Sequence, residues 1–202
     1  MSSDSPETKV EPAIISAPIA GGPRPGSSGG DPDQDILAAL EAGDRPAALR
    51  LCADRHGPAL GRLCMALLGS QAEAEDAAQE TLIAAHAGFD GFRGEGSLRA
   101  WLFSIARRRC ARSLERRSAP VPAEAPDSSP PRADELIEAR HRAEHARALL
   151  AQVRPTEREA LLLRFVGDLS FREVGVACGI DEATARKRVS RALARLRELV
   201  KE

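Results

Sequence analysis

The feature that most constrains the fold is the stretch from residue 168 to 196, which encodes two short helices and the turn between them. Ser170 and Glu173 have the spacing of a capping box, in which each side chain bonds a free backbone N–H of a starting helix. Gly179 follows the apolar positions of that helix, where a left-handed turn residue favours glycine. Asp181 can cap a second helix. Together these signals predict a helix-turn-helix, whose second helix enters the major groove of DNA. The apolar stripe of this second helix is Ala185, Val189, Ala192 and Leu196.

In the second helix, basic and polar residues occupy most of the positions between the members of the apolar stripe. A basic helix face is often simply solvated, so this segment alone leaves a DNA-binding and a purely structural interpretation open. If the helix binds DNA, its early turns reach the groove, whereas Arg195 and Arg197 lie past it. The candidate residues for DNA contact are Arg172, Thr184, Arg186, Lys187, Ser190 and Arg191.

The charges of the chain are strongly segregated, although its formal net charge is only −1. Residues 105–117 contain six Arg and one Glu, and residues 186–201 contain five Arg, two Lys and one Glu. Residues 71–95 contain six acidic residues and one Arg. This pattern is expected of a protein with one nucleic-acid partner and one basic protein partner.

Two proline-rich segments divide the chain. Residues 1–32 contain six Pro, five Gly and six Ser, and we expect a disordered tail because such a segment buries too little apolar surface to offset its ordering entropy. Residues 118–133 contain five Pro and read as a flexible linker. The remaining residues, 33–117 and 134–202, have helical periodicity and no strand-like alternation. The predicted class is therefore all-α: two small helical domains joined by a flexible Pro-rich linker, with the helix-turn-helix in the C-terminal domain.

Local signals mark further helix ends. We expect one helix to start near Pro46 and to end at Gly69. In the helix that follows, Ala77, Leu82 and Ile83 are expected to point inward. The starts of three further helices are predicted: one is capped by Ser70 with Glu73, one by Ser97, and one by Thr156 with Glu159.

The remaining features give little support to an enzyme. Cys52, His56 and Cys64 could share a helix face, but the four cysteines show no paired C-x-x-C spacing, and buried thiols behave as small apolar groups. We therefore expect no metal and no cofactor. No nucleophile–base pair or phosphate loop is visible, so no catalytic residue is predicted. The absence of a signal peptide and of a long apolar run predicts a cytoplasmic protein without membrane contact.

Two stretches together resemble a known family. AEAEDAAQETLIAAHAGFDGFRGEGSLRAWLFSIARRRCARSLERR, residues 72–117, resembles region two of the extracytoplasmic-function (ECF) sigma factors of bacterial RNA polymerase. VRPTEREALLLRFVGDLSFREVGVACGIDEATARKRVSRALARLREL, residues 153–199, resembles region four. The order of the two stretches and the single linker between them also match. The resemblance implies a non-enzymatic subunit that binds core polymerase and directs promoter-specific initiation, as for a stress or envelope-signal regulon.

The resemblance also implies roles for individual residues. The region-four helix-turn-helix would read the −35 element, and an anti-sigma factor would be a further partner. Docking on the clamp helices of the large catalytic subunit of core polymerase is implied for Asp76, Gln79, Glu80, Leu82 and Ile83. Recognition and opening of the −10 element is implied for Phe92, Arg93, Arg99, Trp101, Arg107, Arg108 and Arg109.

The sequence departs from the family pattern in three places. Arg108 stands where Asn is typical, Arg112 where Asp is frequent, and Val174-Gly175 replaces the usual Ile-Ala. The first two changes bear on the −10 base preference. Two other classes of protein remain open: a stand-alone DNA-binding regulator, which has no reason to carry the 71–117 stretch, and an adaptor that binds only protein, which does not need the basic helix.

Overall fold

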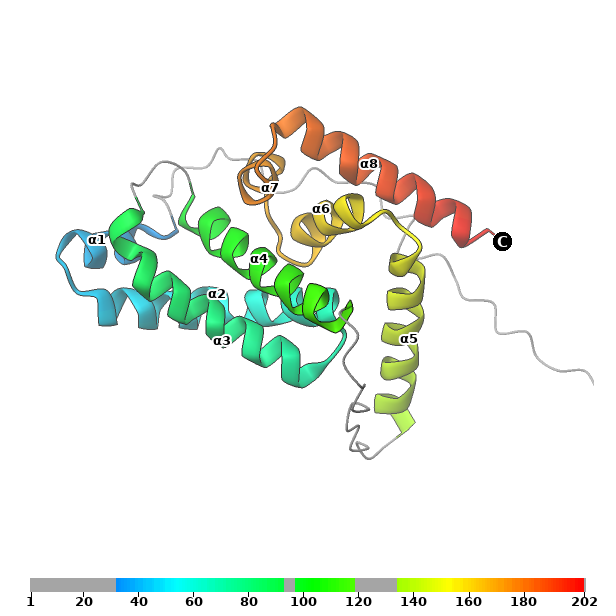
Figure 1. Cartoon of the computed structure of the whole chain (residues 1–202), viewed down its shortest axis with the longest axis horizontal. Helices are drawn as coiled ribbons and strands as arrows, with labels where there is room; N and C mark the ends of the chain where they lie inside the picture. Colours follow the sequence, from blue (N-terminus) through cyan, green and yellow to red (C-terminus); the bar gives the residue numbers. More distant parts are fainter. Residues whose placement is uncertain (1–31, 93–96, 119–133, 202) are drawn as a thin grey trace, which may run out of the picture.

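The computed structural model describes residues 32–92, 97–118 and 134–201, and this part of the chain forms α-helices and one short 3-10 helix, without a strand (Figure 1). The predicted all-α class is confirmed. The predicted linker lies almost wholly outside the described residues, as do nearly all of the predicted tail and Arg93.

The N-terminal half is a bundle of three long helices with two shorter elements. Its elements are α1 (Gln34–Glu41), α2 (Arg45–Leu68), α3 (Gln71–Gly88), the 3-10 helix η1 (Phe89–Gly91) and α4 (Leu98–Ser118). α2 packs on α1, α3 and α4, and α3 also packs on α4. The predicted ends of α2 are confirmed: Asp44 caps its start, Pro46 lies in its first turn, and Gly69 ends it with a φ of 76°.

The C-terminal half contains four further helices. They are α5 (Asp134–Ala151), α6 (Pro155–Phe165), α7 (Phe171–Cys178) and α8 (Glu182–Leu199). The capping box of Ser170 and Glu173 opens α7, Gly179 ends it with a φ of 67°, and the Asp181 side chain caps α8, all as predicted. Val174 and Ala177 of α7 are buried where α7 packs on the apolar stripe of α8, so the two helices of the helix-turn-helix share a buried apolar contact.

The two halves lie against each other in one contiguous core. α4 packs on α7, and α2 contacts α6, so that the C-terminal helices cover one side of the N-terminal bundle (Figure 1). Phe103 of α4 is fully buried, as are Leu163 and Leu169 of the C-terminal half. Nothing in the linear pattern of the helices predicted that the halves would share a core.

Three local predictions need correction. Thr156 and Glu159 do not cap the start of α6, because the residue at the N-cap is Arg154, whose side chain makes no capping bond. Pro155 is the first residue of the helix, where its fixed φ is favourable. At α3 only Ser70 caps, because the Glu73 carboxylate bonds Arg117 on α4 instead. Ile83 points outward and is 69% exposed, because the buried stripe of α3 consists of Ala74, Ala77, Thr81 and Ala85.

Gly175 has a physical reason for replacing the usual alanine. A Cβ at this position would lie 2.8 Å from the backbone oxygen of Ile180, so α7 and the turn after it approach more closely than a side chain allows. Glycine costs ~1 kcal/mol relative to alanine in a helix interior. Here glycine is needed despite this cost, because the chain turns back tightly from α7 toward α8.

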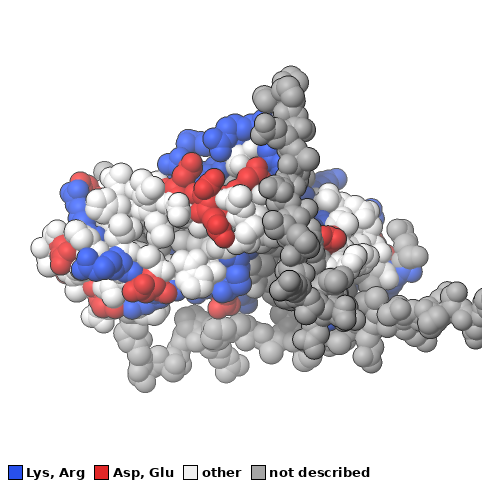
Figure 2. All heavy atoms as spheres, turned by 90° about the horizontal axis from the view of Figure 1, so that it is seen from below, with Lys and Arg blue, Asp and Glu red and all other residues white. Residues whose placement is uncertain are grey.

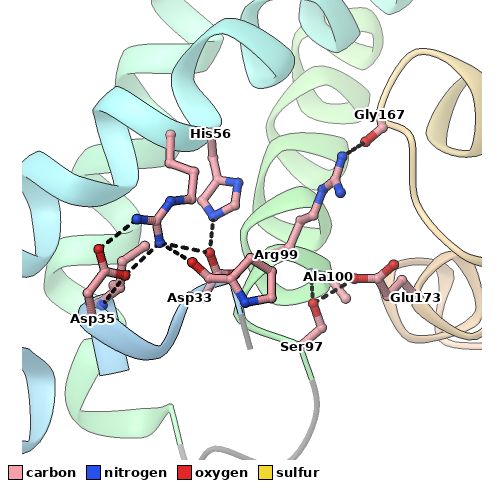
Figure 3. A network of polar contacts seen from close by, with 11 residues as sticks. Asp33, Asp35, His56, Ser97, Arg99, Ala100, Gly167 and Glu173 are labelled. Atoms are coloured by element: carbon pink, nitrogen blue, oxygen red, sulfur yellow. Dashed lines mark hydrogen bonds and ion pairs between the residues drawn. The ribbon is translucent and has the colours of Figure 1, made fainter. Parts of the chain in front are cut away.

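His56, Cys52, Cys64 and Cys110 belong to the core of the N-terminal half, whereas Cys178 is half-buried in α7. Cys52 and Cys64 are fully buried, and burial raises the pKa of the Cys52 thiol to about 11. His56 Nε2 lies 2.9 Å from Asp33 Oδ1, a contact that ties the start of α1 to α2 (Figure 3). Burial alone would raise the pKa of Asp33, but the bonds from His56 and Arg55 outweigh it and lower that pKa below its usual value.

The described residues include no group of three His, Cys, Asp or Glu side chains placed to hold a metal ion. No described helix combines the length and the apolar character needed to cross a membrane.

Candidate functional site

The exposed face of α8 presents the basic residues predicted to contact DNA. Ala185, Val189 and Ala192 are buried against α6 and α7, which turns the opposite face of α8 to solvent. Arg186, Lys187, Ser190 and Arg191 all lie on this exposed face, and Arg172 of α7 is exposed as well. Thr184 differs from them, because it is half-buried and its N–H and hydroxyl both bond the capping carboxylate of Asp181, at 2.8 and 2.6 Å.

Arg186 is held in place by two neighbours. Its Nη2 donates to Glu182 Oε1 one turn earlier, at 2.5 Å, and its guanidinium lies 4.5 Å from the ring centre of Phe171. The guanidinium of Arg164 also lies over the Phe171 ring, at 5.3 Å. Stacking on an aromatic ring and a carboxylate contact fix a guanidinium plane that would otherwise move freely.

The outer face of α3 combines exposed acidic side chains with an exposed apolar one. Asp76 and Gln79 are exposed, Leu82 is half-buried, and Ile83 is the most exposed large apolar residue of the described chain. Glu80 is exposed too, but its carboxylate already pairs with Arg109 of α4 at 3.4 Å. A shallow groove between α3 and α4 is lined by both signs of charge, and Figure 2 shows acidic and basic side chains in adjoining clusters on one face.

Three aromatic rings cluster at the start of α4. Trp101 is half-buried, and its ring centre lies 5.2 Å from that of Phe92 and 6.0 Å from that of Phe89. Phe89 is buried, and Phe92 is half-buried. Trp101 therefore packs as part of the core while leaving part of its surface, with Phe92, open to solvent.

The arginines of α4 point in different directions, which the sequence did not predict. Arg108 is exposed, with its guanidinium 3.3 Å from the hydroxyl of Ser104, and Arg109 turns toward α3. Arg99 and Arg107 instead turn toward the C-terminal half. Arg99 Nη2 donates to the carbonyl oxygen of Gly167 at 2.6 Å, as Figure 3 shows.

The sequence did not predict that two acidic residues of the C-terminal half contact α4 and the residue before it. The Ser97 hydroxyl donates to Glu173 Oε1 at 2.7 Å (Figure 3), and Arg107 lies 3.3 Å from both carboxylate oxygens of Glu159. Burial would raise the pKa of Glu173, but the Ser97 hydroxyl, the capping bonds with Ser170 and the Arg99 charge lower it below its usual value. Both acids stand at capping-box positions in the sequence, a pattern that gives no sign of a distant partner.

Comparison with known proteins decides the family. The model of sigma-70 region 2 matches residues 52–119, and that of sigma-70 region 4 matches residues 144–196. The ECF RNA polymerase sigma factor SigM of Mycobacterium tuberculosis is 31% identical over 168 residues, which cover 83% of this chain and 84% of that protein. The chain belongs to the ECF sigma factors. EcfG of Rhodopseudomonas palustris, another ECF sigma factor, is 31% identical over 149 residues, covering 71% of this sigma factor and 80% of that protein.

Two solved structures are similar to this sigma factor over both halves. CnrH, solved in complex with the cytosolic domain of CnrY, is 25% identical with a TM-score of 0.66, covering 84% of this chain and 97% of that one. RpoE from Bartonella quintana, solved with the anti-sigma factor NepR, is 27% identical with a TM-score of 0.55, covering 84% of this chain and 96% of that one.

Proposed function

We propose that this sigma factor is a non-catalytic subunit that binds core RNA polymerase and directs it to promoters. The observation that carries the proposal is the presence of regions two and four in one chain, together with a helix-turn-helix whose basic face is open to solvent. A stand-alone regulator needs only the helix-turn-helix, and an adaptor that binds only protein does not need its basic face.

The exposed face of α8 is our candidate for reading the −35 element. A recognition helix must hold phosphates and read base edges, and Arg is the residue that most often pairs with guanine in the major groove. Arg186 is the strongest candidate for a base contact because Glu182 and Phe171 fix its orientation before DNA binds. Lys187, Ser190 and Arg191 share its exposed face and complete the candidate surface.

The outer face of α3 is our candidate for docking on core polymerase. Its exposed carboxylate and amide, Asp76 and Gln79, would meet a basic partner, and the exposed Ile83 supplies an apolar contact that a solvated helix would not need. Glu80 would first have to break its ion pair with Arg109, so we expect it to contribute less to polymerase binding.

Opening of the −10 element is assigned to the start of α4. Melting requires cationic groups for the backbone and an aromatic surface on which an unstacked base can rest. Arg108 is exposed, and the partly exposed rings of Phe92 and Trp101 lie together near the helix start. Arg99 and Arg107 join this set only when they leave their present partners in the C-terminal half.

The structural neighbours suggest how the protein is regulated. RpoE from Bartonella quintana was solved with an anti-sigma factor, and we propose that this sigma factor also has such a partner. Release from that partner would then switch on a set of genes for stress or envelope signals.

Run-off transcription with core polymerase and genomic DNA fragments tests the function. We expect transcripts that appear only when this protein is added, and Asp76→Lys should reduce both transcription and capture of core enzyme. Asp54→Lys is the matched control, because it makes the same change of charge at an exposed position of α2, away from the outer face of α3. Binding to duplex DNA without any core-dependent transcript would instead indicate a stand-alone regulator.

A further inference from the structure

We propose that Glu182 determines the DNA specificity of the α8 surface: it directs Arg186 toward guanine and away from DNA phosphates, while Phe171 holds the guanidinium in place. Both are positioning residues, because they act through Arg186. The inference deepens the proposed function and rests on it, since it requires the exposed face of α8 to bind duplex DNA. The ligand is a duplex that presents a guanine to Arg186 in the major groove.

Arg186 keeps donors free for a base. Its bond with Glu182 joins one nitrogen, Nη2, to one carboxylate oxygen, Oε1, at 2.5 Å. Among the described residues, neither Nε nor Nη1 of Arg186 has a hydrogen-bond partner. Bidentate pairing with guanine needs a pair of neighbouring N–H groups, and a guanidinium has more of these than the bond to Glu182 uses. The ion pair therefore leaves Arg186 able to bind guanine.

The carboxylate of Glu182 makes phosphate a weaker partner for the same guanidinium. Glu182 is the first residue of α8, and its side chain is 44% exposed. The start of a helix otherwise attracts anions, but a phosphate that approached Arg186 here would meet a like charge. Guanine presents neutral acceptors, O6 and N7, in the major groove. Glu182 therefore penalises contacts with the DNA backbone more than contacts with a base.

The ring of Phe171 gives the guanidinium a second contact, from another helix. Arg186 Cζ lies 4.5 Å from the centre of this ring, within the range of a cation–π interaction. Phe171 is the first residue of α7 and is half-buried, whereas the side chain of Arg186 is 59% exposed. An anchored ring thus restricts a side chain that solvent would otherwise leave free to move, which lowers the entropy lost on binding a base.

Arg164 of α6 holds the ring of Phe171 in turn. Its Cζ lies 5.3 Å from the ring centre, and its Nη1 donates to the carbonyl oxygen of Leu169 at 3.1 Å. The side chain of Arg164 is only 16% exposed, so this cation belongs to the framework of the domain. Arg164, Phe171 and Arg186 come from α6, α7 and α8. The position of the exposed arginine therefore depends on the packing of all three helices.

A second pair on α8 has the same charges without this support. Glu198 lies 3.3 Å from Arg195 in the last turns of the helix, and in the described part of the chain no aromatic ring lies over the Arg195 guanidinium. This pair also lies past the early turns that reach the groove. Glu198 is therefore a matched control for Glu182.

Binding of the full chain to fluorescent DNA, measured by anisotropy over a salt series, tests the inference. One probe is a pool of short duplexes of random sequence, and the other is the duplex that the wild-type chain enriches most from this pool. The ratio of the two affinities is the sequence preference. Glu182→Gln removes the charge and keeps the shape of the side chain, and Glu198→Gln makes the same change where no base contact is expected.

We expect Glu182→Gln to bind the random pool more tightly than the wild type and to lose about tenfold of its preference, or about 1.4 kcal/mol. One Arg–guanine pair supplies at least about this much discrimination. The salt dependence of pool binding should steepen by about 0.9, because Arg186 gains one phosphate. Glu198→Gln should keep the wild-type preference and salt dependence. Unchanged preference in Glu182→Gln would overturn the inference.

Phe171→Leu tests the aromatic contact. It should lose about two- to fivefold of the preference, as an exposed cation–π contact would predict, with an unchanged salt dependence. Phe165→Leu is the control, because that ring lies beside Arg164, at 5.7 Å, and not beside Arg186. Phe171→Tyr keeps the ring face and should keep the preference. An equal loss of affinity for both probes in Phe171→Leu would show a purely structural role and overturn the assignment of Phe171.

The two levels of the argument fail in different ways. If the wild-type chain enriches no duplex from the pool, the proposed recognition of DNA by α8 is wrong, and this inference is wrong with it. If the wild type enriches a duplex and Glu182→Gln prefers that duplex equally, only the inference is wrong.

Discussion

The helices α4 and α8 carry similar runs of arginine but place them in different environments. In α8, Arg186, Lys187 and Arg191 are exposed while Arg188 is half-buried, and Arg186 bonds only neighbours from its own half. In α4, Arg99 and Arg107 cross to the other half of the molecule. The reason is tertiary: the free carbonyls at the ends of α6 and α7 lie beside α4, whereas no described element covers the outer face of α8. A basic helix face therefore indicates an electronegative partner, but not whether that partner is DNA or protein.

The largest effect should come from the buried ring of Phe103 on α4. Phe103→Ala removes a fully buried ring between the halves and should lower the free energy of unfolding by about 3–5 kcal/mol, as truncation of a buried aromatic does. Denaturation in urea, followed by circular dichroism, measures it. Phe165→Ala is the control: that ring is 53% exposed at the end of α6, and its loss should matter far less. Equal losses for the two variants would mean that α4 is not part of a shared core.

A second test asks whether the exposed face of α8 acts in binding and not in folding. Alanine at Arg186, Lys187, Ser190 and Arg191 together should weaken binding to a −35 duplex by at least about 100-fold, since one Arg–guanine pair is worth ~1–3 kcal/mol. The free energy of unfolding should change little, because surface substitutions usually stay within about 0.5 kcal/mol each. Alanine at Arg195 and Arg197 is the control, for which we expect unchanged base preference. If the fourfold variant keeps its affinity and base preference for the −35 duplex, this face of α8 does not recognise the −35 element.

The smallest effect should be a response of the interface to acid. The pKa of Glu173 lies below its usual value of 4.5, so its ionised form stabilises the folded state. This contribution is complete above pH 4.5 and is lost as the pH falls through the lower pKa of the folded chain. Between pH 6 and 3 the wild type should therefore lose more stability than Glu173→Gln, which keeps the capping geometry. The difference should be less than about 1 kcal/mol, because partly solvated pairs are weak. Parallel losses for the two proteins would contradict the assignment.

The sequence predicted what depends on neighbours along the chain. The caps at Ser170 and Asp181, the turn at Gly179 and the buried stripe of α8 follow from local chemistry, and all were confirmed. The prediction for Ile83 was wrong because small residues, not large ones, form the inner stripe of α3.

The contacts between the halves could not be predicted in the same way. Glu159 and Glu173 both occupy capping-box positions, but only Glu173 caps its helix. Their bonds to Arg107 and Ser97 join residues 52 and 76 positions apart, and no local rule encodes such a distance. The DNA and polymerase contacts of the exposed residues remain predictions.

The ion pair of Arg107 and Glu159 has a consequence for how such proteins evolve and are engineered. Arg107 lies in the segment that matches region two, and Glu159 lies in the segment that matches region four. Recombination that exchanges one region between related genes therefore replaces one member of the pair. A hybrid made by such an exchange therefore inherits, in the same step, an altered contact between its two halves. The fit of the halves would then depend on residue 159 as well as on residue 107.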